Sequence, residues 1–156
     1  VEILAFCLMP NHFHILLKQK KENGIVRFMQ KMGVGYTNYF NEKNKRVGPL
    51  FQGKFKAVLT KTDAHMLHLP FYIHANPLSL NYGNPTSIVD SMRFLEQYRW
   101  SSYPDYIGNK NVPSITSREF LSELVGKGEN HKKMMKDWIE NKEERMENIK
   151  DVAFEE

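Results

Sequence analysis

The chain has 156 residues and a mass of 18.4 kDa, which suits one ordinary domain with a small appendage. Hydrophobic residues make up 41% and charged residues 26%, which excludes a disordered or fibrous chain. No apolar run approaches the roughly 18 residues of a membrane span, and the first residues show no signal-peptide pattern. The single cysteine, Cys7, excludes a disulfide framework or a thiolate-rich zinc site and favours a cytoplasmic setting.

The charge is unevenly distributed along the chain. The net charge is +4 and the pI about 9.1, yet residues 129–156 alone carry −3 and the first 128 residues +7. A basic body with a mildly acidic tail suits a polyanionic partner such as nucleic acid, although many proteins without such a partner are mildly basic too.

The N-terminal half predicts a hairpin, a helix and a further strand. Val1–Met9 and His12–Lys18 are strand-like and flank the turn signal Pro10-Asn11. Because Val1 lies in mid-strand by this pattern, we expect that an N-terminal segment is missing. Helical spacing of apolar residues predicts a helix over Ile25–Asn44, with Tyr36 and Tyr39 committed to packing.

The pattern then returns to a period of two over Leu50–Thr60, which predicts a third strand. Phe51 and Phe55 would share its apolar face, whereas Lys54 and Lys56 would lie on the opposite face.

The C-terminal half is predicted to be mainly helical. Asp63 is a candidate cap for a helix over Ala64–Asn76, which Pro70 should kink and Pro77 should end. The remaining segments are a loop at Asn81–Pro85, a helix at Ser87–Gln97, an aromatic turn region at Trp100–Asn111, and helices at Ser117–Val125 and Asn130–Lys150.

The pattern His12-Phe13-His14 on a strand is the first candidate for chemistry. Side chains two residues apart on a strand point to the same face, so two imidazoles would lie side by side. Imidazole binds divalent transition metals well, and such a pair forms half of a metal site. By itself an H-x-H pair is more often incidental.

The segment Tyr72-Ile73-His74-Ala75-Asn76-Pro77 is the second candidate. Tyr72 and Asn76 lie one helical turn apart on one face, while His74 points elsewhere. The amide oxygen of Asn76 is a possible third ligand. The alternative is that Tyr72 is a core aromatic and Asn76 a helix cap before proline.

Taken together, the motifs CLMPNHFHILLK, GPLFQGKFKAVL, YIHANPL and YRWSSYPDYIG resemble the single-tyrosine HUH transposases, which include REP-associated tyrosine transposases and insertion-sequence enzymes. The resemblance covers about residues 1–108 and implies an α+β, ferredoxin-like antiparallel sheet with helices on one face. Residues 109–156 would form a helical C-terminal extension.

The resemblance also implies the chemistry. Tyr72 would attack one phosphodiester of single-stranded or hairpin DNA and form a 5′-phosphotyrosine, so the same site could rejoin strands. His12, His14 and Asn76 would ligate Mg²⁺ or Mn²⁺. It further implies a homodimer that works on cytoplasmic, nucleoid-associated DNA.

Basic and aromatic residues around these motifs are candidate DNA contacts, although each could equally be a solvated cation or a packed loop aromatic. They are Lys43, Lys45, Arg46, Lys54, Lys56, Arg99 and Trp100, with Tyr103 and Tyr106 as further stacking candidates. Two other functions stay open: a catalytically degenerate relative that only binds structured single-stranded DNA, and a metal-dependent hydrolase unrelated to DNA that uses His12 and His14.

Overall fold

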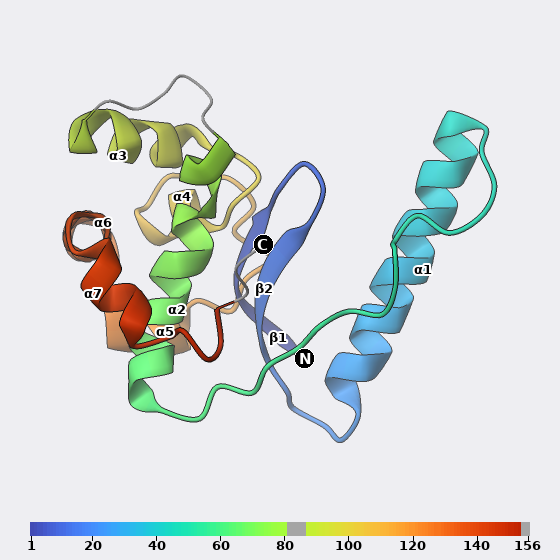
Figure 1. The fold of residues 1–156 in the computed structure, drawn as a ribbon, viewed down its shortest axis with the longest axis horizontal. Helices are drawn as coiled ribbons and strands as arrows, with labels where there is room; N and C mark the ends of the chain where they lie inside the picture. Colours follow the sequence, from blue (N-terminus) through green and yellow to red (C-terminus); the bar gives the residue numbers. More distant parts are fainter. Residues whose placement is uncertain (81–86, 154–156) are drawn as a thin grey trace. The chain divides into compact units, whose positions relative to one another are not determined.

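The computed structural model of the protein describes residues 1–80 and 87–153 (Figure 1). The predicted loop at Asn81–Pro85 therefore lies outside the described residues. The chain divides into two units, which we name the α1 unit (Val1 with residues 18–58) and the hairpin unit (residues 2–17 and 59–156). The elements in chain order are β1 (Glu2–Leu8), β2 (Phe13–Lys18), α1 (Gly24–Asn44), α2 (Asp63–Ala75), the 3₁₀ helix η1 (Asn76–Leu80), α3 (Ile88–Gln97), α4 (Tyr103–Tyr106), α5 (Glu119–Val125), α6 (Glu129–Glu140) and α7 (Lys142–Glu147).

The predicted α+β class with a helical C-terminal part is confirmed. Within the described ranges, β1 and β2 form a two-stranded antiparallel sheet, and seven α-helices accompany it. None of these helices is both long enough and apolar enough to cross a bilayer.

The predicted third strand at Leu50–Thr60 is wrong, because the segment has no strand structure. Alternation alone does not make a strand, since each strand needs a neighbouring edge to accept its backbone hydrogen bonds. Gly53 adds backbone freedom within the segment, and Gly48, with φ of 93°, breaks the chain direction just before it.

Helix α1 forms most of the α1 unit and ends where Lys45 adopts a left-handed conformation with φ of 51°. Of its side chains only Met29 is buried. The expectation that Tyr36 and Tyr39 are packed is wrong, because their exposed fractions are 49% and 57%. An apolar stripe is buried only where another element covers it.

The core of the hairpin unit forms where α2 packs on β1. Four consecutive β1 residues, Leu4 to Cys7, are buried, and α2 buries nearly every residue from Leu69 to Ala75. The N-cap of α2 is Thr62, whose hydroxyl accepts a hydrogen bond from the His65 N–H at 3.2 Å. Asp63, predicted as the cap, is the first helical residue.

The second edge of β1 is closed by residues from much later in the chain. Cys7 forms an isolated antiparallel bridge with Ser101, and the Leu8 N–H donates to the Trp100 carbonyl at 2.8 Å. Farther along the strand, the Ser117 N–H donates to the Ile3 carbonyl at 2.8 Å. These bonds satisfy backbone groups that would otherwise form an open sheet edge.

The C-terminal helices pack on α2 and α3 within the same unit. Helix α6 buries His131, Met135 and Trp138 and contacts α2, α3, α5 and α7. The predicted single helix over Asn130–Lys150 is divided at Asn141, whose φ and ψ of −113° and 31° leave the helical region.

Candidate active site

The two histidines of the H-x-H pattern lie side by side, as strand geometry predicted. The Nε2 atoms of His12 and His14 are 3.1 Å apart, and the ring centroids are 4.9 Å apart with planes at 89°. His14 belongs to β2, and His12 directly precedes it. Both side chains are partly buried.

This separation fits two ligands of one metal ion. Two atoms that each bind an ion at about 2.1 Å and at a right angle are about 3.0 Å apart. Without an ion, one Nε2 must carry the proton, because two facing lone pairs repel. The donor set therefore fits a divalent transition metal that prefers imidazole. No group of three or more His, Cys, Asp and Glu side chains that could hold a metal occurs in the described part of the chain.

Asn11 sets the orientation of His12. Its Oδ1 lies 2.7 Å from His12 Nδ1, which directs the Nδ1 proton towards the amide oxygen. The lone pair then lies on Nε2, the atom that faces His14. An outer hydrogen bond of this kind fixes the tautomer and the ring plane of a metal-ligating histidine. Sequence reasoning missed Asn11 and treated it only as part of a turn.

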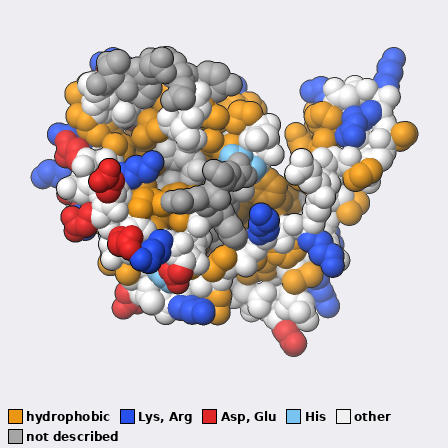
Figure 2. All heavy atoms as spheres, viewed as in Figure 1, with side chains coloured by type: hydrophobic (Ala, Val, Ile, Leu, Met, Phe, Trp, Pro, Cys, Tyr) orange, Lys and Arg blue, Asp and Glu red, His pale blue; other side chains and the backbone are white. Residues whose placement is uncertain are grey.

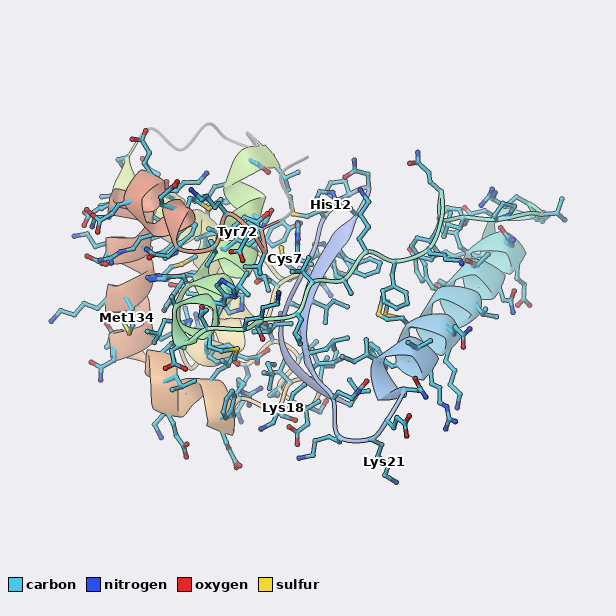
Figure 3. The ribbon with its side chains drawn as sticks, turned by 60° about the horizontal axis from the view of Figure 1, so that its bottom comes forward. Cys7, His12, Lys18, Lys21, Tyr72 and Met134 are labelled. Atoms are coloured by element: carbon cyan, nitrogen blue, oxygen red, sulfur yellow. The ribbon has the colours of Figure 1, made fainter. Side chains whose placement is uncertain are left out.

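Tyr72 lies beside the histidine pair. Its ring centroid is 5.7 Å from that of His14, with the planes at 78°. Figure 3 labels Tyr72 on α2 and His12 at the turn end of the hairpin, both within the hairpin unit. The packing of α2 on β1 therefore brings a phenol next to the imidazoles, although 58 residues of sequence separate His14 and Tyr72.

Asn76 follows the last residue of α2 and is partly buried. Its Nδ2 donates to the Tyr72 carbonyl at 2.8 Å, so the side chain does cap the helix. This bond engages the amide nitrogen only, and the carbonyl oxygen keeps its capacity as a ligand atom. The cap and the ligand readings of Asn76 are therefore compatible.

His74 points away from the face of Tyr72 and Asn76, as predicted, and its side chain lies in the core, where it connects α2 to β1. It is fully buried, and its Nε2 lies 2.8 Å from Ser102 Oγ. The same hydroxyl accepts the Phe6 N–H at 2.9 Å and lies 3.3 Å from the Phe6 carbonyl. Burial lowers the pKa of His74 well below its ordinary value, so the ring is neutral. The bond from His74 to Ser102 thus fixes α2, and with it Tyr72, on the strand.

The complete bonding of Ser102 indicates which nitrogen of His74 carries the proton. Nδ1 of His74 has no partner and is buried. A buried bare acceptor costs less than a buried unpaired N–H. The proton therefore belongs on Nε2, which donates to Ser102 Oγ, and the hydroxyl donates to the Phe6 carbonyl. Sequence reasoning missed Ser102, although the serine pair in YRWSSYPDYIG was the available signal.

Two tyrosines suggested as base-stacking residues are instead structural. Tyr103 and Tyr106 are buried, and Tyr106 Oη donates to the Leu4 carbonyl at 2.6 Å. Burial raises the pKa of both phenols. That part of the DNA-contact prediction is wrong, because aromatic residues in a turn-rich segment here fill the core beside β1.

The remaining predicted DNA contacts belong to two units. Lys43, Lys45, Arg46, Lys54 and Lys56 lie in the α1 unit and are mostly exposed. Arg99 and Trp100 lie in the hairpin unit, where the guanidinium of Arg99 is 5.0 Å from the Trp100 ring centroid and the ring is 53% exposed. Their roles stay predictions.

Cys7 does not contribute to this chemistry. It is fully buried, and burial raises the pKa of its thiol to about 12. A thiol in that state is a poor nucleophile and a poor metal ligand.

Comparison with known proteins gives one match. The family model described as "Transposase IS200 like" matches residues 1–76, a range that holds His12, His14, Tyr72 and Asn76. Searches of curated proteins and of solved structures found no match.

Proposed function

We propose that the protein cleaves and rejoins single-stranded or hairpin DNA through a 5′-phosphotyrosine. The match over residues 1–76 supports this proposal, because it favours assigning the chain to the IS200-like transposases, which carry out DNA transposition. The observation that carries the proposal is the contact between the paired imidazoles, 3.1 Å apart, and the Tyr72 ring, 5.7 Å from His14. A nucleophile beside a metal-binding pair is the arrangement that metal-assisted phosphoryl transfer needs.

The proposed ligands are His12, His14 and the amide oxygen of Asn76. Mg²⁺ or Mn²⁺ bound there would stabilise negative charge on the phosphate oxygens. Imidazole donors favour Mn²⁺ over Mg²⁺. Asn11 orients His12, and the bond from Asn76 Nδ2 to the Tyr72 carbonyl leaves the Asn76 amide oxygen able to act as a ligand.

Tyr72 is the proposed nucleophile. Its Oη attacks phosphorus, the Oη–P bond forms and the bond from phosphorus to the 3′-oxygen breaks. The phenolic proton leaves to solvent, and the departing 3′-oxygen takes up a proton to give a free 3′-OH. Because the phosphotyrosine retains a phosphodiester bond, a 3′-OH can attack it in the reverse direction and rejoin the strand. The scaffold of His74 and Ser102 holds Tyr72 in register with the histidines.

We also propose that the protein acts on DNA in the cytoplasm as a homodimer. The basic side chains that would contact the DNA backbone are those of Lys43, Lys45, Arg46, Lys54, Lys56 and Arg99, and the exposed Trp100 ring would stack on a base. Sedimentation at working concentration tests the dimer directly.

The mechanism is tested by covalent trapping on a denaturing gel. A 5′- and 3′-labelled oligonucleotide that carries sequence flanking the gene is incubated with Mn²⁺ and the protein. We expect wild type to form a slow-migrating adduct through the 5′-phosphate. Tyr72→Phe should form none, because it lacks the oxygen that attacks phosphorus. The fold should survive this substitution, because almost no packing volume is lost. His12→Ala is expected to lose the adduct while DNA binding is largely retained, since binding rests mainly on backbone charge.

Two outcomes would refute the mechanism. One is an adduct of normal yield from Tyr72→Phe, which would assign the attack to another residue. The other is wild-type product that carries a free 5′-phosphate and no adduct, which would mean that water attacks. Tyr36→Phe is the matched control, because it removes the same oxygen from a tyrosine in the other unit.

A further inference from the structure

The α1 unit has a charge opposite to that of the rest of the chain. Residues 18–58 hold ten Lys and Arg against two Asp and Glu, a net charge of +8, whereas the whole chain carries only +4. The remainder is therefore acidic. On the face drawn in Figure 2, Lys and Arg side chains lie alongside hydrophobic ones over α1. This unit is the part of the protein best suited to a polyanion.

Aromatic rings form a continuous surface on one face of α1. Tyr36 is in ring contact with Tyr39, Phe40 and Phe51, at centroid distances of 6.4, 6.2 and 6.3 Å. The spacing of 36, 39 and 40 places these side chains on one helical face. Gly33 lies on the same face, and a Cβ there would meet the Phe51 ring at 4.0 Å. The two tyrosine rings, about half exposed, extend this surface towards solvent.

Cations lie directly beside these rings. Lys43 Nζ donates to Tyr39 Oη at 3.3 Å and is 5.6 Å from the centroid of that ring. The guanidinium of Arg46 is 5.7 Å from the Phe40 ring centroid, and its NH2 donates to the Pro49 carbonyl at 3.1 Å. Ring faces and positive charges thus alternate along one end of the helix. An aliphatic docking surface for a protein partner would not need these charges.

We propose that this face of α1 is a stacking platform for single-stranded DNA, on which Tyr36 and Tyr39 take unpaired bases and Lys43 and Arg46 hold the adjoining phosphates. The inference rests on the proposed function only for the identity of the ligand as DNA. Bases offer their faces to aromatic side chains only when they are unpaired, so a duplex would use the charges and not the rings. A second copy of this chain is disfavoured as the occupant, because a two-fold contact would bring two strongly positive units together.

The test separates stacking from charge by comparing two probes. Binding of labelled oligo(dT) of 15 nucleotides and of an abasic oligomer of equal length is measured by fluorescence anisotropy. All proteins carry Tyr72→Phe, so that cleavage does not interfere. We expect the pair Tyr36→Ala and Tyr39→Ala to weaken oligo(dT) binding at least 25-fold, about fivefold per ring, and abasic binding less than twofold.

Matched variants keep the result interpretable. Tyr36→Phe with Tyr39→Phe retains both rings and should bind as the parent does. Val34→Ala alters an equally exposed residue on the opposite face of α1 and should change nothing, since Val34 is 63% exposed. Circular dichroism of each variant reports whether α1 still forms. If the alanine pair unfolds the helix, the comparison of single Tyr39→Ala with Tyr39→Phe replaces it.

Three outcomes would overturn the inference. They are equal losses on the two probes, no loss on either probe, and a loss of self-association in sedimentation instead of a loss of DNA binding. Ring-dependent binding of oligo(dT) in the Tyr72→Phe background, together with no covalent adduct from wild type, would refute the proposed cleavage and leave the platform intact. An adduct from a protein without ring-dependent binding would do the reverse.

Discussion

Replacing Ser102 by alanine tests whether a buried hydroxyl fixes α2 on β1. The hydroxyl is fully buried and serves three groups: Nε2 of His74, and the N–H and the carbonyl of Phe6. Alanine fits the same space but leaves two buried donors, the Phe6 N–H and the His74 Nε2–H, without an acceptor. Each orphaned donor costs about 2 kcal/mol, so the free energy of unfolding should fall by about 4 kcal/mol.

The effect should be large against a typical stability of about 5 to 15 kcal/mol. Urea unfolding followed by tryptophan fluorescence measures it, and Trp138, which is 2% exposed, reports on the core. The midpoint should move while the dependence on urea stays constant. Because Ser102 links His74 of α2 to Phe6 of β1 and so holds Tyr72 in place, the yield of covalent adduct should fall even at temperatures where the variant is folded.

Ser91→Ala is the matched control. Ser91 is partly exposed on α3, and its hydroxyl donates only to the Ser87 carbonyl, at 3.0 Å. Its loss should change stability by less than about 0.5 kcal/mol. A Ser102→Ala variant that loses less than about 1 kcal/mol would refute the reasoning, because it would mean that water or a side-chain shift satisfies both donors.

Two further predictions use other parts of the hairpin unit. Stability should fall as the pH is lowered from about 6.5 to about 4, because burial lowers the pKa of His131 to about 4 and the unfolded chain therefore binds the proton first. His131 alone should account for a loss of about 3 kcal/mol in urea unfolding at several pH values, and the buried His74, whose pKa is lowered as well, adds to the loss in the same direction. His74, Tyr103 and Tyr106 are the titratable groups in ring contact with His131, and none of them is a carboxylate that could stabilise the His131 cation. A free energy of unfolding that stays constant between these pH values would contradict the prediction. Asn11→Ala should weaken Mn²⁺ binding about 10- to 100-fold in calorimetry, whereas Asn38→Ala, an exposed asparagine of α1, should not; equal affinities would exclude Asn11 from orienting His12.

Local sequence patterns correctly predicted the elements that are specified by residues close together in the sequence. The hairpin followed from two apolar runs and a Pro-Asn turn, and the extent of α2 followed from a polar start and a proline stop, although its N-cap is Thr62 and not Asp63. The pairing of His12 with His14 follows from strand geometry alone. Its contact with Tyr72 was accessible only through the resemblance to a family, since no local pattern fixes how α2 packs on the sheet.

The wrong predictions share one physical cause. Burial and strand pairing depend on neighbours in space, which local sequence patterns do not identify. The segment at Leu50–Thr60 alternates like a strand but pairs with none. Tyr36 was expected to be packed on the apolar stripe of a helix and Tyr103 to be available for base stacking, yet Tyr36 is half exposed and Tyr103 is fully buried. Ser102 was invisible for the same reason, because its three partners lie on β1 and α2.

The closure of β1 by residues from much later in the chain has a consequence for how the protein is made. The backbone hydrogen bonds on this edge join Leu8 to Trp100, Phe6 to Ser102 and Ile3 to Ser117. None of them can form before the later residue of its pair has been synthesised. During synthesis, one edge of this apolar strand stays open until more than a hundred residues have left the ribosome. Pairings of such high sequence separation are slow to form. We expect the nascent chain to need chaperone protection over that interval, and a message that ends before residue 117 to yield an aggregation-prone product.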